Sequence, residues 1–136
     1  MGCIHCGVDE CEAKFHECLA RDFTDPDYGT VHHLTVSAYK LQHNAYTNEI
    51  AEPMVAFVLN HLDEPPGEQT KRDIRGRTDG AQQVARQRPA PPICSPSEWS
   101  LTVADVDLET GSTYRDTVRA WAESVARVLA REAQND

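Results

Sequence analysis

Three cysteines near the start of the chain have the spacing of a metal-binding turn. Cys3 and Cys6 are separated by two residues, Gly7 follows them, and Cys11 supplies a third thiol. Two intervening residues let both sulfurs of such a pair point at one ion, and a glycine can adopt the positive φ of the turn that follows. The pattern predicts a site for zinc, which suits thiolate and imidazole ligands and needs no redox partner.

The fourth ligand of such a site must come from elsewhere in the chain. On a continuous helix Cys18 lies about 10 Å beyond Cys11, whereas two sulfurs on one zinc stand less than about 4 Å apart. We therefore interpret Cys18 as a small buried hydrophobic residue. His16 points about 140° away from Cys11 around the same helix, which places it on the surface. His5 is sterically awkward, because its ring would have to fold back onto its own turn.

We favour His43 as the fourth ligand. A short link makes the first two predicted helices antiparallel neighbours, so the end of the second lies beside the start of the first. His32 lies about 16 Å from His43 along the helix axis, too far to bind the same ion. The predicted metal ligands are Cys3, Cys6, Cys11 and His43. A three-thiolate site with water and a set of unliganded thiols are the alternatives, while an iron–sulfur cluster lacks a suitably spaced fourth cysteine.

The hydrophobic pattern predicts an all-α fold that positions these residues. Its periodicity indicates a first helix over about 10–23, a second from Pro26 to about Ala45, a third over 52–62 and a last over about 113–132. Asp9 and Glu12 have the spacing of a capping box, and Phe23 ends the first apolar stripe. We expect a small helical bundle in which an N-terminal zinc knuckle closes a hairpin of the first two helices.

Residues 63–98 form a polar, Pro- and Arg-rich excursion within one expected domain spanning residues 1–136. Residues 78–88 are a candidate short surface helix, and four prolines in 89–96 predict an extended strap. The apolar alternation between Trp99 and Val106 suits a strand, but Thr102 and Asp105 have the spacing of a helix start. We favour one helical turn there. Pro53 is tolerable only in the first turn of the third helix.

Composition and charge exclude several classes of function. A chain of 136 residues, 40% of them hydrophobic, supports one compact domain with a modest core. The formal net charge of -9 argues against binding to a nucleic acid backbone. No signal peptide or long apolar run is visible, which predicts a cytoplasmic protein without a membrane contact. In that reducing compartment five cysteines indicate metal ligands or buried thiols rather than disulfides.

A row of neutral polar side chains shares one face of the second helix. His32, Tyr39 and His43 lie on it at helical spacing, where a solvated face would carry Glu and Lys. We favour the interpretation that His32 and Tyr39 are core residues bonded to backbone carbonyls or acids of the first helix. The alternative makes His32 a general acid or base, with Tyr39 as a hydrogen-bond donor.

Several segments of the chain have a distinctive sequence: DPDYGTVHHLTV at 25–36, YKLQH at 39–43, the N-terminal Cys-x-x-Cys-Gly, LTVADV at 101–106 and Trp121. Together they resemble a family of small bacterial proteins catalogued as a domain of unknown function. The resemblance is close up to His43 and looser after it. The resemblance implies a bacterial, metal-binding helical protein and supplies no activity.

Two functions follow from this sequence. We favour a zinc-stabilised binding or accessory protein, whose groove between the second helix and the Pro-rich strap receives a small molecule or a protein segment. The alternative is a small zinc-dependent hydrolase, lyase or cyclase that uses an open zinc position or the pair His32 and Tyr39. Coordination separates the two, because four protein ligands close a structural site whereas three plus water permit catalysis.

Overall fold

The structure, a computed structural model, describes residues 2–64, 67 and 92–134. This part of the chain contains helices and no strands, which confirms the all-α prediction. The helices are α1 (Cys11–Thr24), α2 (Pro26–Gly29), α3 (His32–Gln42), α4 (Asn48–Asn60) and α6 (Gly111–Gln134), with 3₁₀ turns η1 (Pro96–Glu98) and η2 (Val103–Asp105). None of the helices described here is both long and apolar enough to span a membrane.

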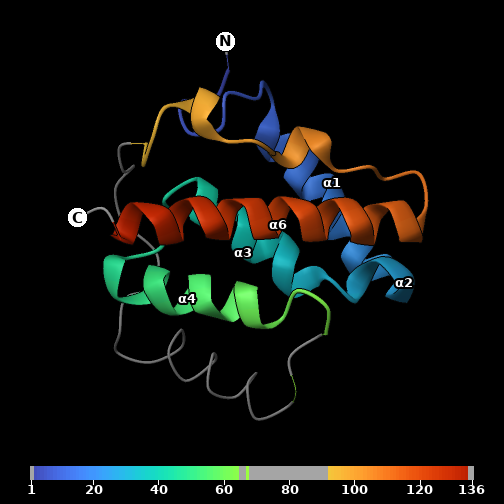
Figure 1. Ribbon diagram of the computed structural model, residues 1–136. Coiled ribbons are helices and arrows are strands. Elements are labelled where there is room, and N and C mark those ends of the chain that lie inside the picture. The colour runs from blue at the N-terminus through green and yellow to red at the C-terminus, as the bar shows by residue number, and fades with distance from the viewer. Residues whose placement is uncertain (1, 65–66, 68–91, 135–136) are drawn as a thin grey trace.

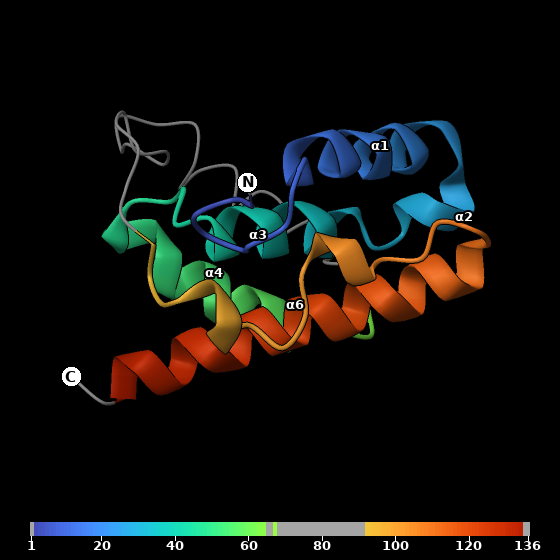
Figure 2. The ribbon, with the colours of Figure 1, turned by 90° about the horizontal axis from the view of Figure 1, so that it is seen from above.

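The long helix α6 runs along the whole molecule, and the other helices are arranged around it (Figure 1). Helices α3 and α4 pack on α6 and on each other, while the short α2 contacts both α1 and α6. Seen from above, α3 lies between α1 and α6 (Figure 2). One side of α3 therefore packs against α6, and its other side packs against α1.

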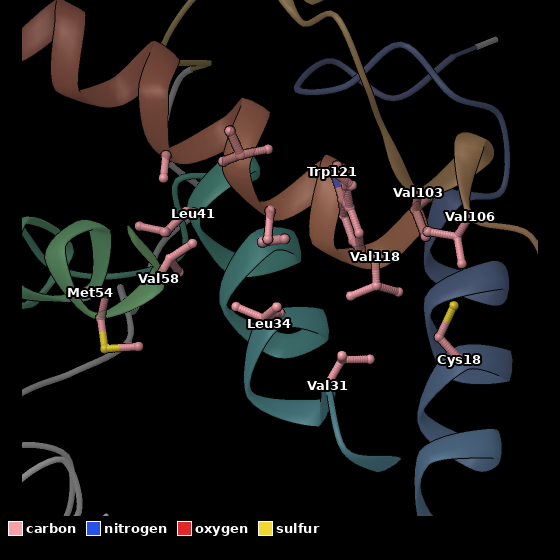
Figure 3. Close-up of a cluster of buried hydrophobic side chains, with 14 of the residues drawn as sticks. Cys18, Val31, Leu34, Leu41, Met54, Val58, Val103, Val106, Val118 and Trp121 are labelled. Carbon is pink, nitrogen blue, oxygen red and sulfur yellow. The ribbon is translucent and has the colours of Figure 1, made fainter. Parts of the chain in front are cut away.

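Buried apolar side chains from these helices form one cluster (Figure 3). Trp121 of α6 is fully buried in it, and its Nε1 donates a hydrogen bond of 3.1 Å to Oε1 of Gln42. The Gln42 amide in turn donates to the carbonyl of Leu101 at 2.9 Å. Cys18 is also fully buried there, which confirms its interpretation as a core residue. The labelled members are Cys18, Val31, Leu34, Leu41, Met54, Val58, Val103, Val106, Val118 and Trp121.

The second predicted helix is interrupted. Helix α2 ends at Gly29, and α3 begins only at His32. A Cβ atom on Gly29 would lie 2.5 Å from the carbonyl oxygen of Asp22, so only a glycine allows α2 to approach α1 this closely. The apolar spacing continues through the break, and hydrophobic periodicity therefore does not reveal it. At its other end α3 stops at Gln42, because Asn44 takes a left-handed φ of 52°.

The start of α1 differs from the predicted capping box. Glu10, with a left-handed φ of 56°, is the N-cap, and its side chain makes no capping hydrogen bond. The capping box of Asp9 and Glu12 was therefore wrong, although the helix itself is confirmed. At the opposite end of α1 it is Asp22 that points inward, whereas Phe23, expected on the apolar stripe, is 75% exposed.

Helix α4 begins four residues before the predicted start at Glu52. Pro53 consequently lies in its second turn, where the missing N–H leaves the carbonyl of Glu49 without its helical partner. The helix ends at Asn60, two residues before the predicted end at Leu62. Tertiary packing of the apolar body of α4 compensates for the hydrogen bond lost at the Glu49 carbonyl. The expectation that Pro53 lies in the first turn of the helix was therefore wrong.

The segment before α6 agrees with the prediction of a helical turn. In η2 the Thr102 hydroxyl accepts from the Ala104 N–H at 3.2 Å, and the Asp105 carboxylate accepts from the Thr102 N–H at 2.9 Å. Residues 92–95 of the predicted strap form neither helix nor strand. The candidate helix over 78–88 and the first part of the strap lie outside the described residues.

Candidate metal centre

The N-terminal knuckle, residues 3–8, is a tight turn closed by its own backbone. The N–H of Cys3 donates to the carbonyl of Val8 at 3.2 Å, and the N–H of Gly7 donates to the carbonyl of Cys3 at 2.8 Å. Gly7 has a φ of 80°, the conformation that its predicted role in the turn required. The closure holds the two thiols of Cys3 and Cys6 on one compact loop.

The segment around η1 anchors this knuckle. The indole Nε1 of the buried Trp99 donates to the carbonyl of His5 at 2.9 Å. A Cβ atom on Gly7 would lie 3.1 Å from the Cβ of Pro96, so the turn sits directly against η1. The knuckle is thus fixed by residues about 90 positions later in the chain.

The structure brings the four predicted ligands together. Their three sulfurs and one imidazole nitrogen all lie within 4.8 Å of one another, and they belong to Cys3, Cys6, Cys11 and His43. Cys11 is the first residue of α1 and His43 is the C-cap of α3, so two helix ends meet at the knuckle. Cys11 Sγ and His43 Nε2 are 3.5 Å apart. A tetrahedral zinc ion would hold such a pair about 3.6 Å apart, so the cluster could hold a metal ion.

The ring of His43 is already in the form that binds metals. Its Nδ1 donates a hydrogen bond of 2.7 Å to the carbonyl of Tyr39, so the lone pair lies on Nε2, which faces Cys11. A backbone carbonyl in this outer position fixes the tautomer and the orientation of a metal-binding histidine. Burial lowers the pKa of His43 below its ordinary value, which keeps the imidazole neutral near pH 7.

The three thiols cannot all ionise easily on their own. Burial raises the pKa of Cys6 to about 12, and burial also raises the pKa of Cys11. At Cys3 burial opposes ionisation, but the backbone N–H groups of Cys6 and His5 outweigh it and the pKa falls below its ordinary value. A bound divalent cation would supply the positive charge that two further thiolates need.

Tyr39 forms one wall of the cluster. Its ring stacks on Phe15, with centroids 3.9 Å apart, and on His43, with centroids 4.0 Å apart. Its hydroxyl lies 3.9 Å from Cys11 Sγ, and burial raises the pKa of Tyr39 so that the hydroxyl stays neutral. Tyr39 and His32 are seven residues, or about 10 Å of helix rise, apart and have different partners, so they do not form one chemical site.

His16 and His5, which the sequence did not favour as the fourth metal ligand, both lie outside the cluster of ligand atoms. His16 has a side chain that is 63% exposed and its Nε2 is 3.9 Å from the Glu12 carboxylate, which confirms its surface position. His5 lies beside His43, with ring centroids 5.5 Å apart, but does not belong to the cluster of ligand atoms. Within the described residues its buried Nδ1 has no hydrogen-bond partner.

A buried carboxylate at the far end of α1 escaped the sequence analysis. The side chain of Asp22 is fully buried, its Oδ1 accepts from the Tyr114 hydroxyl at 2.6 Å, and its Oδ2 lies 2.9 Å from Nδ1 of His32. This confirms that His32 bonds to an acid of the first helix. The signal was available, because Asp22 follows Phe15 and Cys18 at the helical spacing of seven and four residues.

A pocket of about 310 Å³ lies apart from the cysteine cluster. It is bordered by the start of α3, the residues after α4 and one face of α6. Arg115 donates to Asp27, and Arg119 donates to Asp63 at 2.7 Å, so both guanidinium groups at its edge are held in place. The pocket shares no residue with the cluster of Cys3, Cys6, Cys11 and His43.

Comparison with known protein families identifies a match over most of the chain. The model of a family of unknown function, DUF5946, matches residues 1–130, a range that includes the knuckle, both helix ends at the cluster and most of α6. No curated protein and no solved structure matches the chain.

Proposed function

The chain belongs to the DUF5946 family of unknown function, and we propose that it is a zinc protein in which Cys3, Cys6, Cys11 and His43 hold one structural Zn²⁺. The observation that carries the proposal is the meeting of three sulfurs and a correctly oriented imidazole nitrogen within 4.8 Å. Three thiolates and one imidazole suit zinc better than the harder divalent cations, which prefer oxygen ligands.

The proposed ion has a structural role because four protein ligands fill a tetrahedral zinc. No position is left for a bound water, which a catalytic zinc requires. The ligands come from three separate pieces of chain: the knuckle, the start of α1 and the end of α3. Zinc at this place would fasten the N-terminal residues to the junction of two helices. A binding or accessory protein is therefore favoured over a zinc-dependent hydrolase, lyase or cyclase.

The binding role is supported by the pocket of about 310 Å³. Its edge presents Arg115 and Arg119 beside the acids Asp63 and Asp116, together with the hydroxyl of Thr30. Such mixed charges suit a small polar molecule, or a segment of a partner protein, that carries both donors and acceptors. We propose that this small molecule or partner segment binds in the pocket and does not contact the zinc.

Metal analysis combined with thermal unfolding tests the zinc proposal. Protein purified without chelator should contain about one zinc per chain, and its complete removal should destabilise the fold by several kcal/mol, because the binding energy of a structural zinc is folding energy. A shift of melting temperature on the order of 10 °C is expected. Substoichiometric metal of every kind, or an unchanged melting temperature after complete removal, would refute the structural role.

A further inference from the structure

The buried carboxylate of Asp22 is not explained by a structural zinc at the other end of α1. Its side chain is fully buried, and in the described part of the chain its polar partners are the Tyr114 hydroxyl and the imidazole of His32. A buried carboxylate costs several kcal/mol unless it is paired and hydrogen-bonded. The two hydrogen bonds, from the Tyr114 hydroxyl and the His32 ring, are what compensate the burial of this carboxylate.

The arrangement fixes the tautomer of the neutral His32 ring. A carboxylate only accepts hydrogen bonds, so the 2.9 Å contact places a proton on Nδ1, and in the neutral ring the lone pair then lies on Nε2. The Tyr114 hydroxyl holds Asp22 from the other side and is itself 3.2 Å from the hydroxyl of Thr35, which is fully buried. The carboxylate therefore has a rigid support.

The free edge of the ring is accessible. The side chain of His32 is 37% exposed, and Nε2 has no hydrogen-bond partner among the described residues. Phe23, which is 75% exposed, lies beside it with ring centroids 4.9 Å apart. A lone pair fixed by a buried carboxylate thus opens to solvent next to an exposed aromatic face.

We propose that His32 is a nucleophile toward uncharged, activated acyl compounds, with Asp22 and Tyr114 as positioning residues. Nε2 attacks the carbonyl carbon, and the bond to the leaving group breaks, so that an alcoholate, phenolate or thiolate departs with the electron pair. The acyl-imidazolium keeps its proton on Nδ1, where the carboxylate of Asp22 balances the new positive charge. Water then adds to the acyl carbon, the bond from that carbon to Nε2 breaks with its electron pair returning to Nε2, and a carboxylic acid leaves, while the remaining proton of the water is released to solvent.

The surroundings favour an uncharged acyl donor over a phosphoryl donor. Asp25, three residues after Asp22, caps α2, and its negative charge opposes an approaching phosphate. The exposed ring of Phe23 offers apolar area for an aromatic or short aliphatic substituent. Esters and thioesters with such substituents are the expected substrate class.

The test is acetylation of the full-length protein by p-nitrophenyl acetate at pH 8, with mass spectrometry to locate and time each acetyl group. His16 is the internal reference, because it is more exposed, lies on the same helix as Asp22, and has the exposed Glu12, and no buried carboxylate, as its ion-pair partner within the described residues. We expect His32 to react at least about tenfold faster than His16. An equal or slower rate at His32 would overturn the proposal, whatever the zinc content of the sample.

Three variants and one spectrum distinguish a nucleophilic His32 from a His32 whose hydrogen bond to Asp22 only stabilises the fold. His32→Gln should abolish the fast phase of p-nitrophenolate release, whereas His16→Gln should leave it unchanged. Asp22→Asn, which removes the charge and keeps the size, should slow acetylation of His32 at least about tenfold. An unchanged rate in folded Asp22→Asn protein would contradict the role of Asp22. Nitrogen-15 spectra of the wild-type imidazole must show the proton on Nδ1, and a proton on Nε2 would also overturn the proposal.

Discussion

Nε2 of His43 lies 3.5 Å from Sγ of Cys11, although 32 positions separate the two residues in the chain. The contact exists because α3 runs back along α1, so that the end of one helix meets the start of the other. The knuckle adds two more thiols at the same place. A metal ion at this junction would join three chain segments: the knuckle, the start of α1 and the end of α3.

Replacing Cys6 by serine should remove zinc and destabilise the fold. The Cys6 thiol is buried in the knuckle, and a serine hydroxyl is a much poorer zinc ligand than a thiolate. We expect a loss of several kcal/mol in the free energy of unfolding, measured by urea denaturation beside metal analysis. Cys94→Ser, a change of the same chemistry outside the cluster, should retain zinc. Equal metal content in the two variants would contradict the assignment of Cys6.

Replacing His43 by alanine tests the ligand supplied by α3. Affinity for zinc, or for cobalt as its visible substitute, should fall at least about tenfold, because an open position replaces the imidazole. The cobalt spectrum should also change, since the thiolate set remains while the nitrogen is lost. His16→Ala provides the control, because His16 is exposed and does not belong to the cluster of ligand atoms. A His43→Ala protein that binds cobalt with the wild-type spectrum would exclude His43 as a ligand.

Zinc binding should release protons from the thiols and none from His43. Burial raises the pKa of Cys6 to about 12 and raises that of Cys11, so both are protonated at pH 8 without metal, whereas burial lowers the pKa of His43 and leaves its ring neutral. Because zinc displaces thiol protons, its affinity must fall as the pH falls. Calorimetry in buffers of different protonation enthalpy should give about two to three protons released. Fewer than two would contradict this ionisation scheme.

Gln42 is predicted to be a structural residue of the core. Gln42→Leu leaves the Trp121 indole N–H and the Leu101 carbonyl without their partner in a buried place, which should cost about 2–4 kcal/mol in urea unfolding. In a Trp121→Phe background the same change should cost less, because the indole donor is already absent. Additive effects of the two substitutions would show that the hydrogen bond contributes little.

The location of the candidate site could be predicted from the sequence because it depends on local spacing and one antiparallel pairing. The Cys-x-x-Cys turn is local, and His43 follows from the reversal between α1 and α3. The interruption at Thr30 and Val31 lies at the opposite end of α3, so missing it did not displace His43. The meeting of His43 with Cys11 therefore does not depend on where the second helix begins.

The features that escaped prediction are set by tertiary contacts. The break after Gly29 follows from the approach of α2 to the Asp22 carbonyl, which no periodicity encodes. The burial of Asp22 itself depends on Tyr114, 92 positions later. Pro53 is accepted inside α4 because the packing of that helix outweighs one lost hydrogen bond. In each case a partner remote in the chain decides the local structure.

X-ray absorption at the zinc edge, on protein purified without chelator, tests the central proposal most directly. We expect a four-coordinate ion with three sulfur neighbours at about 2.3 Å and one nitrogen neighbour, with imidazole outer-shell scattering, at about 2.0 Å. A fit that requires an oxygen ligand in place of the imidazole, or a sample without a sulfur-bound metal, would contradict the proposal.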